Sequence, residues 1–166
     1  MGANSYVCRI ASPEEMQRKW DAEIELHPGE SNWVVWKGEA LDSARSGRSL
    51  PYYGILDGVI ICEATAVLFP DFPWRGGAAE AGTVELVAFR TVKAHRGQGY
   101  FSRLMRFLLN DLKQRGCTRA VVGVEPQEQH NRDIYRHWGF TEYVGSGTET
   151  YPDGTVIEVL FYAKAL

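Results

Sequence analysis

Apolar and polar residues recur with two different periods in the first half of the chain, and each period predicts its own element. Residues 6–11 are typical of a short strand. A Ser-Pro-Glu-Glu sequence at residues 12–15 opens a helix whose apolar positions recur at helical spacing up to His-Pro-Gly at residues 27–29. A second helix is predicted from about residue 32 to residue 44. Asp57-Gly58 separates two apolar runs and predicts a tight hairpin.

The segment at residues 83–140 organises the rest of the prediction. A β-branched and aromatic run at residues 84–92 predicts a strand, and an amphipathic helix follows at residues 100–115. Residues 119–124 predict another strand, which a right-handed crossover would make parallel to the first. A further helix precedes Phe140.

The tail of the chain predicts two strands joined by a turn at residues 151–154. We find no internal repeat, low-complexity tract or linker. The predicted fold class is therefore α+β: one domain over residues 1–166, with a mixed, mostly antiparallel sheet of about seven strands and about four helices.

A glycine turn joins the strand at residues 84–92 to its helix. It is Arg96-Gly97-Gln98-Gly99-Tyr100-Phe101. Glycine lets the backbone bend and approach a ligand closely, and the start of a helix offers unpaired N–H groups at the positive end of the helix dipole. Together with the charge of Arg96, this pattern indicates a site for a phosphate-bearing ligand. Glycine in such a turn also has a purely geometric use, so the pattern alone leaves both interpretations open.

The composition is that of an ordinary soluble globular protein. The 166 residues carry a net charge of -3, which does not suggest nucleic acid as a partner. No apolar run reaches the ~20 residues of a membrane helix, and the N-terminus lacks the features of a secretory signal. The 3 cysteines are widely spaced, which argues against a metal site or disulfides and favours free thiols in the cytoplasm.

The organising segment resembles the GNAT superfamily of acyl-CoA-dependent N-acetyltransferases. Residues 92–99, Val-Lys-Ala-His-Arg-Gly-Gln-Gly, look like the family's strand end and its Arg/Gln-x-x-Gly-x-Gly/Ala pyrophosphate loop. Residues 135–140, Tyr-Arg-His-Trp-Gly-Phe, look like the Tyr-x-x-x-Gly-Phe end of its next helix. The motif match covers about 50 residues of 166, and the element order covers nearly the whole chain. Phe101 departs from the pattern, which has Gly or Ala, and Glu128 stands where many relatives have Asn.

The resemblance implies acetyl-CoA as acyl donor and no metal. It also implies that the parallel strands splay apart at the centre of the sheet, with the pantetheine arm in the gap and the pyrophosphate on the amides of the turn. The cofactor-binding residues implied are Arg90, Thr91, Val92, Arg96, Gly97, Gln98, Gly99, Tyr100 and Phe101, with Asn131 as a further candidate.

Acetyl transfer to an amine needs a base and an acid. The amine must lose a proton before it attacks, and the leaving thiolate departs more easily when it is protonated. Tyr135 matches the family's tyrosine that donates this proton. Glu85 is our candidate base, and Glu125 and His137 are weaker ones.

The acceptor is expected to be a primary amine of a small molecule or a peptide. Its site would be built from the early helices, the loop at residues 71–82 and the C-terminal hairpin. Dimers are common among such folds, so a homodimer is an open expectation. The candidate wall residues are Trp33, Tyr52, Tyr53, Trp74 and Arg75.

Two alternatives stay open at this point. A dinucleotide-binding enzyme would use Gly97-x-Gly99 as part of its fingerprint and Glu125 as a ribose-binding acid, but only one strand–helix–strand unit is present, late in the chain. A non-catalytic sensor of acetyl-CoA would have the same pyrophosphate loop. Tyr135 favours the enzyme over the sensor.

Overall fold

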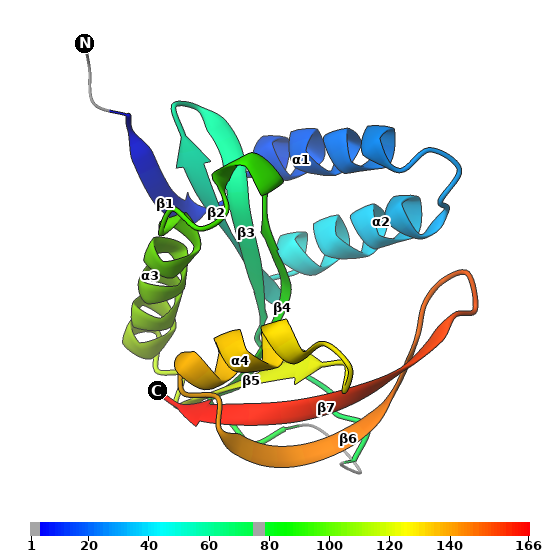
Figure 1. Ribbon diagram of the computed structural model, residues 1–166, viewed down its shortest axis with the longest axis vertical. Helices are drawn as coiled ribbons and strands as arrows, with labels where there is room; N and C mark the ends of the chain where they lie inside the picture. The colour runs from blue at the N-terminus through cyan, green and yellow to red at the C-terminus, as the bar shows by residue number, and fades with distance from the viewer. Residues whose placement is uncertain (1–3, 75–78) are drawn as a thin grey trace.

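Strands in the order β1-β2-β3-β4-β5-β7-β6 form one seven-stranded sheet (Figure 1). The computed structural model describes residues 4–74 and 79–166. Among the strands in these residues, β4 and β5 form the one parallel pair, and all other neighbours are antiparallel. The strands are β1 (Tyr6–Ile10), β2 (Ser49–Leu56), β3 (Val59–Val67), β4 (Thr83–Thr91), β5 (Arg119–Val124), β6 (Glu142–Thr150) and β7 (Val156–Ala165).

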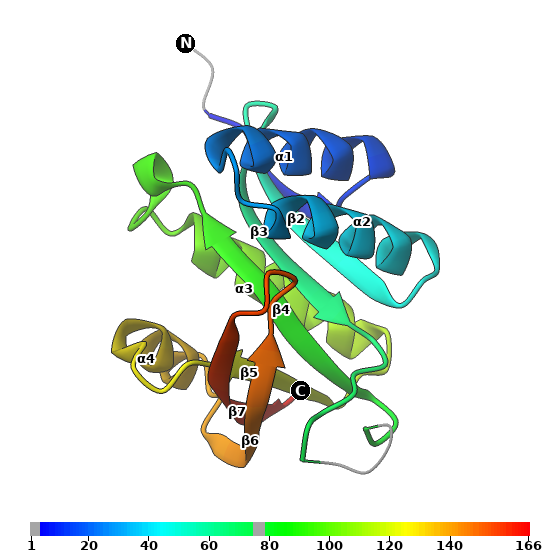
Figure 2. The same ribbon diagram turned by 90° about the vertical axis from the view of Figure 1, so that its right-hand side faces the viewer.

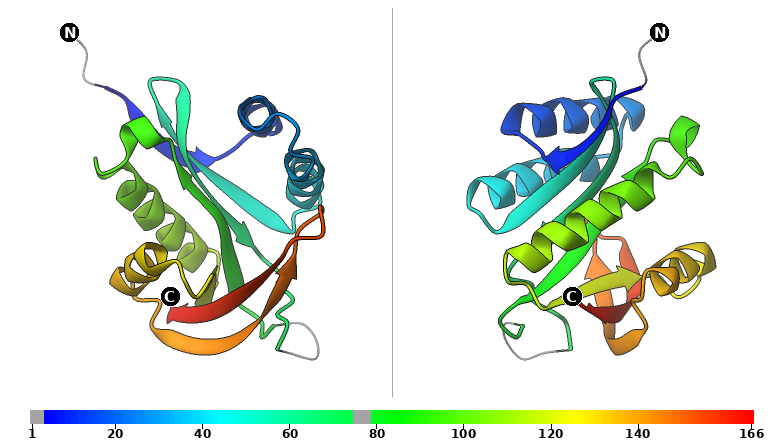
Figure 3. Two further views of the ribbon diagram at one scale, coloured as in Figure 1. Left: turned by 45° about the vertical axis from the view of Figure 1, so that its right-hand side comes forward. Right: turned by 90° about the vertical axis from the view of Figure 1, so that its left-hand side faces the viewer.

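Helices cover both faces of the sheet. The left panel of Figure 3 shows α1 and α2 on one face and α3 and α4 on the other. In the described part of the chain, no helix is long and apolar enough to cross a membrane. The predicted α+β class, with about seven strands and about four helices, is confirmed. The helices are α1 (Pro13–Leu26), α2 (Asn32–Arg45), α3 (Tyr100–Gln114) and α4 (Gln129–His137), and a 3-10 turn, η1 (Lys93–His95), precedes α3.

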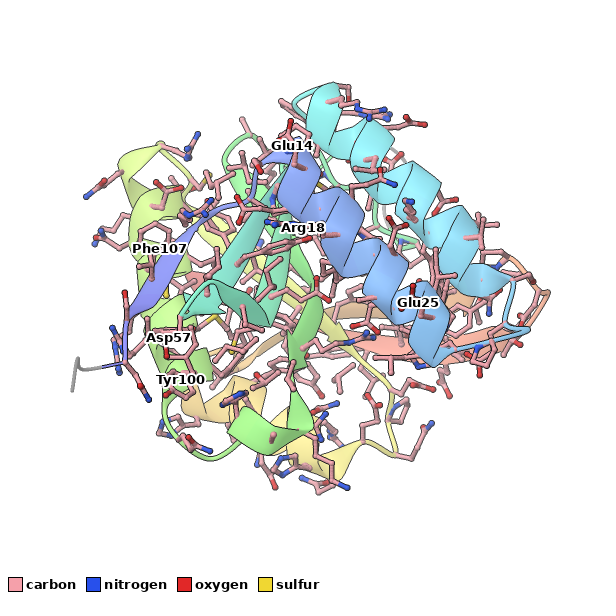
Figure 4. The ribbon with its side chains drawn as sticks, turned by 90° about the horizontal axis from the view of Figure 1, so that it is seen from above. Glu14, Arg18, Glu25, Asp57, Tyr100 and Phe107 are labelled. Atoms are coloured by element: carbon pink, nitrogen blue, oxygen red, sulfur yellow. The ribbon has the colours of Figure 1, made fainter. Side chains whose placement is uncertain are left out.

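The first helix begins where its sequence predicts. The Ser12 hydroxyl accepts a hydrogen bond from the Glu15 N–H, and the Glu15 carboxylate accepts one from the Ser12 N–H, each at 3.2 Å. A capping box of this kind stabilises a helix by about 1 kcal/mol. Figure 4 shows Glu14, Arg18 and Glu25 on the outward face of α1.

α3 packs its predicted apolar stripe against the sheet. Leu104, Met105, Leu108 and Leu112 are at most 1% exposed. Burying each leucine stabilises the fold by about 2 kcal/mol. Gly116, with φ +88°, follows the end of the helix in the left-handed conformation that a terminating glycine adopts.

β4 and β5 separate after a short ladder. They pair from Thr83 with Arg119 to Leu86 with Val122, and β4 then continues to Thr91 without β5. Ala88 has φ +57°, and the register between β3 and β4 shifts at this point. A left-handed alanine costs roughly 1 kcal/mol, so the surrounding sheet must hold this bulge in place. The bulge ends the regular pairing where the two strands diverge, and Figure 2 shows β4 running away from β5.

The tip of the β6–β7 hairpin is tied to α2. The Asn32 amide donates to the Asp153 carboxylate at 3.0 Å, and the Asp153 N–H donates to the Asn32 side-chain oxygen at 2.8 Å. The rings of Trp36 and Tyr151 meet edge to face at a centroid distance of 5.2 Å. The left panel of Figure 3 shows the hairpin tip reaching α2. The hairpin therefore joins the α1–α2 side of the sheet.

Candidate active site

A cavity of about 570 Å³ lies between the end of β4 and the first turns of α3 and α4. A cleft of this size can hold part of an extended ligand. Glycine, aromatic and basic residues share its wall. The lining residues are Phe89, Arg90, Thr91, His95, Arg96, Gly97, Gly99, Tyr100, Phe101, Ser102, His130, Asn131, Ile134 and Tyr135.

The turn before α3 has the backbone form that its glycines predict. φ is +73° at Gly97 and +85° at Gly99, and no heavy atom lies within 4 Å of a Cβ built at either position. Gly99 is the N-cap of α3, so the unpaired N–H groups of the first helical turn lie at the cavity wall. The Arg96 Nε donates to the Thr91 carbonyl at 2.9 Å, which holds positive charge beside the turn. This combination is typical of an anion site.

Tyr6 of β1 supports the start of α3. Its hydroxyl donates to the Tyr100 carbonyl at 2.9 Å, and the two rings lie 4.7 Å apart. The Arg103 guanidinium carbon lies 4.6 Å from the centre of the Tyr6 ring. A Cβ at Gly54 would lie 2.1 Å from the Tyr6 oxygen, so only glycine leaves room for the hydroxyl. Figure 4 marks Tyr100 at this junction.

Tyr135 of α4 lies in the cavity wall. Its ring is 5.4 Å from that of Phe89 on β4 and 6.4 Å from that of Phe140. Burial, and then the charge of Glu128, raises the pKa of Tyr135 to about 12. The phenol therefore stays protonated at neutral pH and can serve as a proton donor.

Glu85 of β4 lies on the other face of the sheet. Its neighbours Val84 and Leu86 belong to the core that packs against α3, and alternation along the strand turns Glu85 away from them. Burial, and then the charge of Glu149, raises the pKa of Glu85 to about 7. A carboxyl group with this pKa can take up and release a proton near neutral pH.

Arg90 lines the cavity and also belongs to an ion-pair network beside α1. Its guanidinium forms an ion pair with Glu23 of α1 and lies 4.0 Å from Glu63. The same group stacks over Trp33 at 4.7 Å. Lys19 completes the network, with its ammonium 2.7 Å from the Glu63 carboxylate. Basic and acidic groups are therefore balanced in this network.

Most of the predicted cofactor residues meet at the cavity. Of the predicted residues, Val92, Gln98 and Glu85 are not part of its lining. The Val92 N–H bonds to the Ile61 carbonyl, and the Gln98 side chain turns back to the Ala94 carbonyl.

Five lining residues were missed by the sequence prediction. His95 and Ser102 directly flank the glycine turn, and His130 precedes Asn131. Their position beside predicted cofactor residues is the sequence feature that could have indicated them. Phe89 and Ile134 were predicted only as apolar positions of their strand and helix. These residues add two imidazoles and a hydroxyl to the polar groups of the cavity.

The predicted acceptor wall needs correction at two tyrosines. Tyr52 is fully buried, and its hydroxyl donates to Asp111 of α3 at 2.6 Å. Tyr53 is 1% exposed and packs in the core beneath α1 and α2. Neither can form a wall that a ligand touches. Trp74 stacks on Phe72, while Arg75 lies outside the described residues.

A family model for the acetyltransferase (GNAT) family matches residues 11–140. The match spans most of the chain, so the protein belongs to the GNAT acetyltransferase family. It is accordingly an acetyl-CoA-dependent N-acetyltransferase. A search of curated protein sequences finds no significant match.

Solved structures share the fold at low sequence identity. An N-acetyltransferase from Staphylococcus aureus Mu50 is 15% identical with a TM-score of 0.67, covering 97% of this chain and 98% of that one. A ribosomal-protein-alanine N-acetyltransferase from Brucella melitensis is 16% identical with a TM-score of 0.68, covering 96% and 99%. The protein yncA from Salmonella typhimurium, solved with its cofactor acetyl-CoA, is 19% identical with a TM-score of 0.65, covering 97% and 94%. These likenesses support the predicted splayed-sheet architecture.

Proposed function

We propose that the cavity binds acetyl-CoA, with the pyrophosphate at the turn of residues 96–101 and the pantetheine arm along the open edge of β4. The left-handed glycines, the free helix start and the Arg96 charge support an anionic ligand there. The edge of β4 beyond Leu86 lacks β5 as a partner and so has backbone groups available for an extended chain. Asn131 and His130 supply further polar contacts from α4.

In the proposed reaction, Glu85 accepts the first proton of the protonated amine, directly or through water. The amine nitrogen then attacks the thioester carbonyl, the new C–N bond forms and the C–S bond breaks. Tyr135 gives its phenolic proton to the leaving sulfur. The nitrogen loses its second proton to the Tyr135 phenolate, directly or through water, which restores the phenol. The proton held by Glu85 passes to water, so one proton is released in each turnover.

One observation carries this proposal: the two proton-transfer groups lie on the two sides of the splayed strands. Tyr135 lines the cavity on the α3–α4 side, while Glu85 projects from the opposite face of β4. Their pKa values, about 12 and about 7, also suit an acid that stays protonated and a base that works at neutral pH.

Replacing Tyr135 with Phe is expected to lower kcat about 30-fold and to leave acetyl-CoA affinity within about twofold. Thiol release measures the rate, and isothermal titration measures the affinity. Tyr143→Phe is the matched control, because Tyr143 is 57% exposed on β6. A Tyr135→Phe variant with unchanged kcat would exclude the general-acid role. Acetyl-CoA binding without transfer to any amine would instead favour the sensor.

Tyr6→Phe is expected to weaken acetyl-CoA binding about fivefold, because the Tyr100 carbonyl loses its hydrogen bond and the start of α3 is held less firmly. The affinity for S-acetylpantetheine, which has no pyrophosphate, is expected to stay the same. Titration of both ligands separates the two effects. An equal loss for both ligands would mean that Tyr6 has only a general structural role.

The proposal also includes the extent of the catalytic domain and the kind of acceptor. We propose that the whole of residues 1–166 forms one catalytic domain, and that the acceptor is a primary amine of a small molecule or peptide. A cytoplasmic location and a homodimer stay predictions from the sequence.

A further inference from the structure

The end of β4 that borders the cavity is supported by the sheet on one side. β4 pairs with β5 as far as Leu86, and from Val87 to Thr91 its neighbour among the described strands is β3. The register with β3 is itself interrupted by the bulge at Ala88. A strand edge that receives an extended ligand binds it more tightly when the edge is already held in position. Side-chain contacts outside the sheet can supply this support.

Four charged side chains from three elements meet between α1 and the sheet. Lys19 and Glu23 lie one helical turn apart on α1, Glu63 lies on β3 and Arg90 lies on β4. The Lys19 ammonium is 2.7 Å from the Glu63 carboxylate, and Arg90 forms its ion pair with Glu23. Lys19 is 9% exposed and Glu63 is 6% exposed. Because burial limits screening by solvent and salt, these charges interact strongly, and we call the four residues the α1–β4 network.

The α1–β4 network meets β4 directly beyond the bulge. Glu63 is the register partner of Arg90, and the next residue of β4, Thr91, pairs with Cys62. The Arg90 guanidinium also lies over the Trp33 ring of α2 at 4.7 Å. Arg90 and Thr91 both line the cavity. The network therefore ties the cavity end of β4 to β3, α1 and α2 at once.

We propose that the α1–β4 network positions the end of β4 for the pantetheine arm, with Lys19, Glu23 and Glu63 acting through Arg90 as positioning residues. This inference rests on the proposed function, since it requires the arm to lie along this edge. With the network intact, the edge is ordered before the ligand arrives, so little conformational freedom is lost on binding. Without the network, the ligand itself has to order the segment beyond Ala88, which weakens binding.

The α1–β4 network is expected to affect one part of the cofactor. The Arg90 charge is compensated by Glu23 and Glu63, so it adds little attraction for the pyrophosphate. The amides proposed to bind the pyrophosphate belong to the turn before α3, which Tyr6 supports from β1. A change in the network should therefore weaken the binding of the pantetheine arm and leave the binding of a bare pyrophosphate unchanged.

The test compares acetyl-CoA with ADP, which has a pyrophosphate but no pantetheine arm, by isothermal titration. Glu23→Gln is expected to weaken acetyl-CoA binding about fivefold and to leave ADP affinity within about twofold. Glu15→Gln is the matched control, because Glu15 is another ion-paired glutamate of α1, but its partner is Arg9 of β1. It should keep both affinities at the wild-type values, even where it lowers stability.

A second variant separates position from stability. Lys19→Met combined with Glu63→Leu removes the buried ion pair and fills its volume with apolar groups, a change that often leaves stability unaffected or raises it. It also removes the Glu63 charge that faces Arg90. Acetyl-CoA binding is expected to fall about fivefold in this variant too, with ADP binding unchanged and stability to denaturant near that of wild type.

The other outcomes contradict different parts of the proposal. Wild-type acetyl-CoA affinity in either network variant, or an equal loss for acetyl-CoA and ADP, overturns the positioning role and leaves the proposed function standing. The same loss of acetyl-CoA affinity in Glu15→Gln also overturns it, because the effect would then follow from the loss of any ion pair of α1. Failure of the wild type to bind acetyl-CoA overturns the proposed function and the inference together.

Discussion

Glu85→Gln is expected to lower the rate of acetyl transfer about 300-fold at pH 7, because the amide cannot accept the proton of the amine. In wild type, kcat/KM should rise with pH through the pKa of Glu85, about 7, as the carboxylate forms. In the variant, the rise of kcat/KM near pH 7 should be absent, and only the rise that comes from deprotonation of the free amine should remain. Thiol release between pH 5.5 and pH 9 measures both profiles.

The same substitution should change stability in a pH-dependent way. The folded-state pKa of Glu85, about 7, lies above the ordinary value of 4.5, so its contribution to stability is full below pH 4.5 and is lost as pH rises through 7. The difference between these values corresponds to about 3 kcal/mol. Glu85→Gln should therefore be more stable than wild type at pH 8, but not at pH 4, in denaturant unfolding.

Glu158→Gln is the control for both measurements, since Glu158 is exposed and lies away from the splayed strands. It should match wild type in rate and in stability at each pH. A Glu85→Gln variant that keeps the wild-type pH–rate profile would exclude Glu85 as the base. Glu125 would then be the next candidate, because it directly follows the end of β5, the parallel neighbour of β4.

Gly99→Glu is expected to weaken acetyl-CoA binding more than about 100-fold. Gly99 has φ +85°, where a side chain is strained, and the new carboxylate would stand at the positive start of α3. The charge would repel the pyrophosphate in the place where we propose that it binds. Isothermal titration with acetyl-CoA measures the loss.

Gly116→Glu provides the matched control for this substitution. Gly116 has φ +88° and also has open space around it, but it follows the opposite end of the same helix. It should suffer comparable backbone strain and keep its acetyl-CoA affinity. Equal losses in both variants would show that strain, and not the anion site, explains the effect. Titration with NAD tests the dinucleotide-binding alternative, and tight binding of NAD in its place would contradict the proposed function.

The sequence by itself determined the elements whose patterns are local. The apolar stripe of α3, the capping box at Ser12 and the Asp57-Gly58 hairpin each depend on residues within a few positions of one another, so spacing alone predicts them. The glycine turn before α3 is local in the same sense. Its φ values follow from the two glycines, and its use for anions follows from the helix that begins at Gly99.

Only the tertiary structure decided which distant groups meet. Nothing near Ala88 in the chain predicts a left-handed alanine, because the bulge depends on β3 on one side and on the loss of β5 on the other. The sequence predicts Tyr52 as a wall residue of the acceptor site, but the side chain is fully buried and its hydroxyl donates to Asp111 of α3. The effect of the Glu149 charge on the pKa of Glu85 joins two residues that are far apart in the chain, and it arises from the fold of the sheet and from burial. Long-range pairing sets both which face a side chain occupies and how dry its surroundings are, and local spacing contains neither.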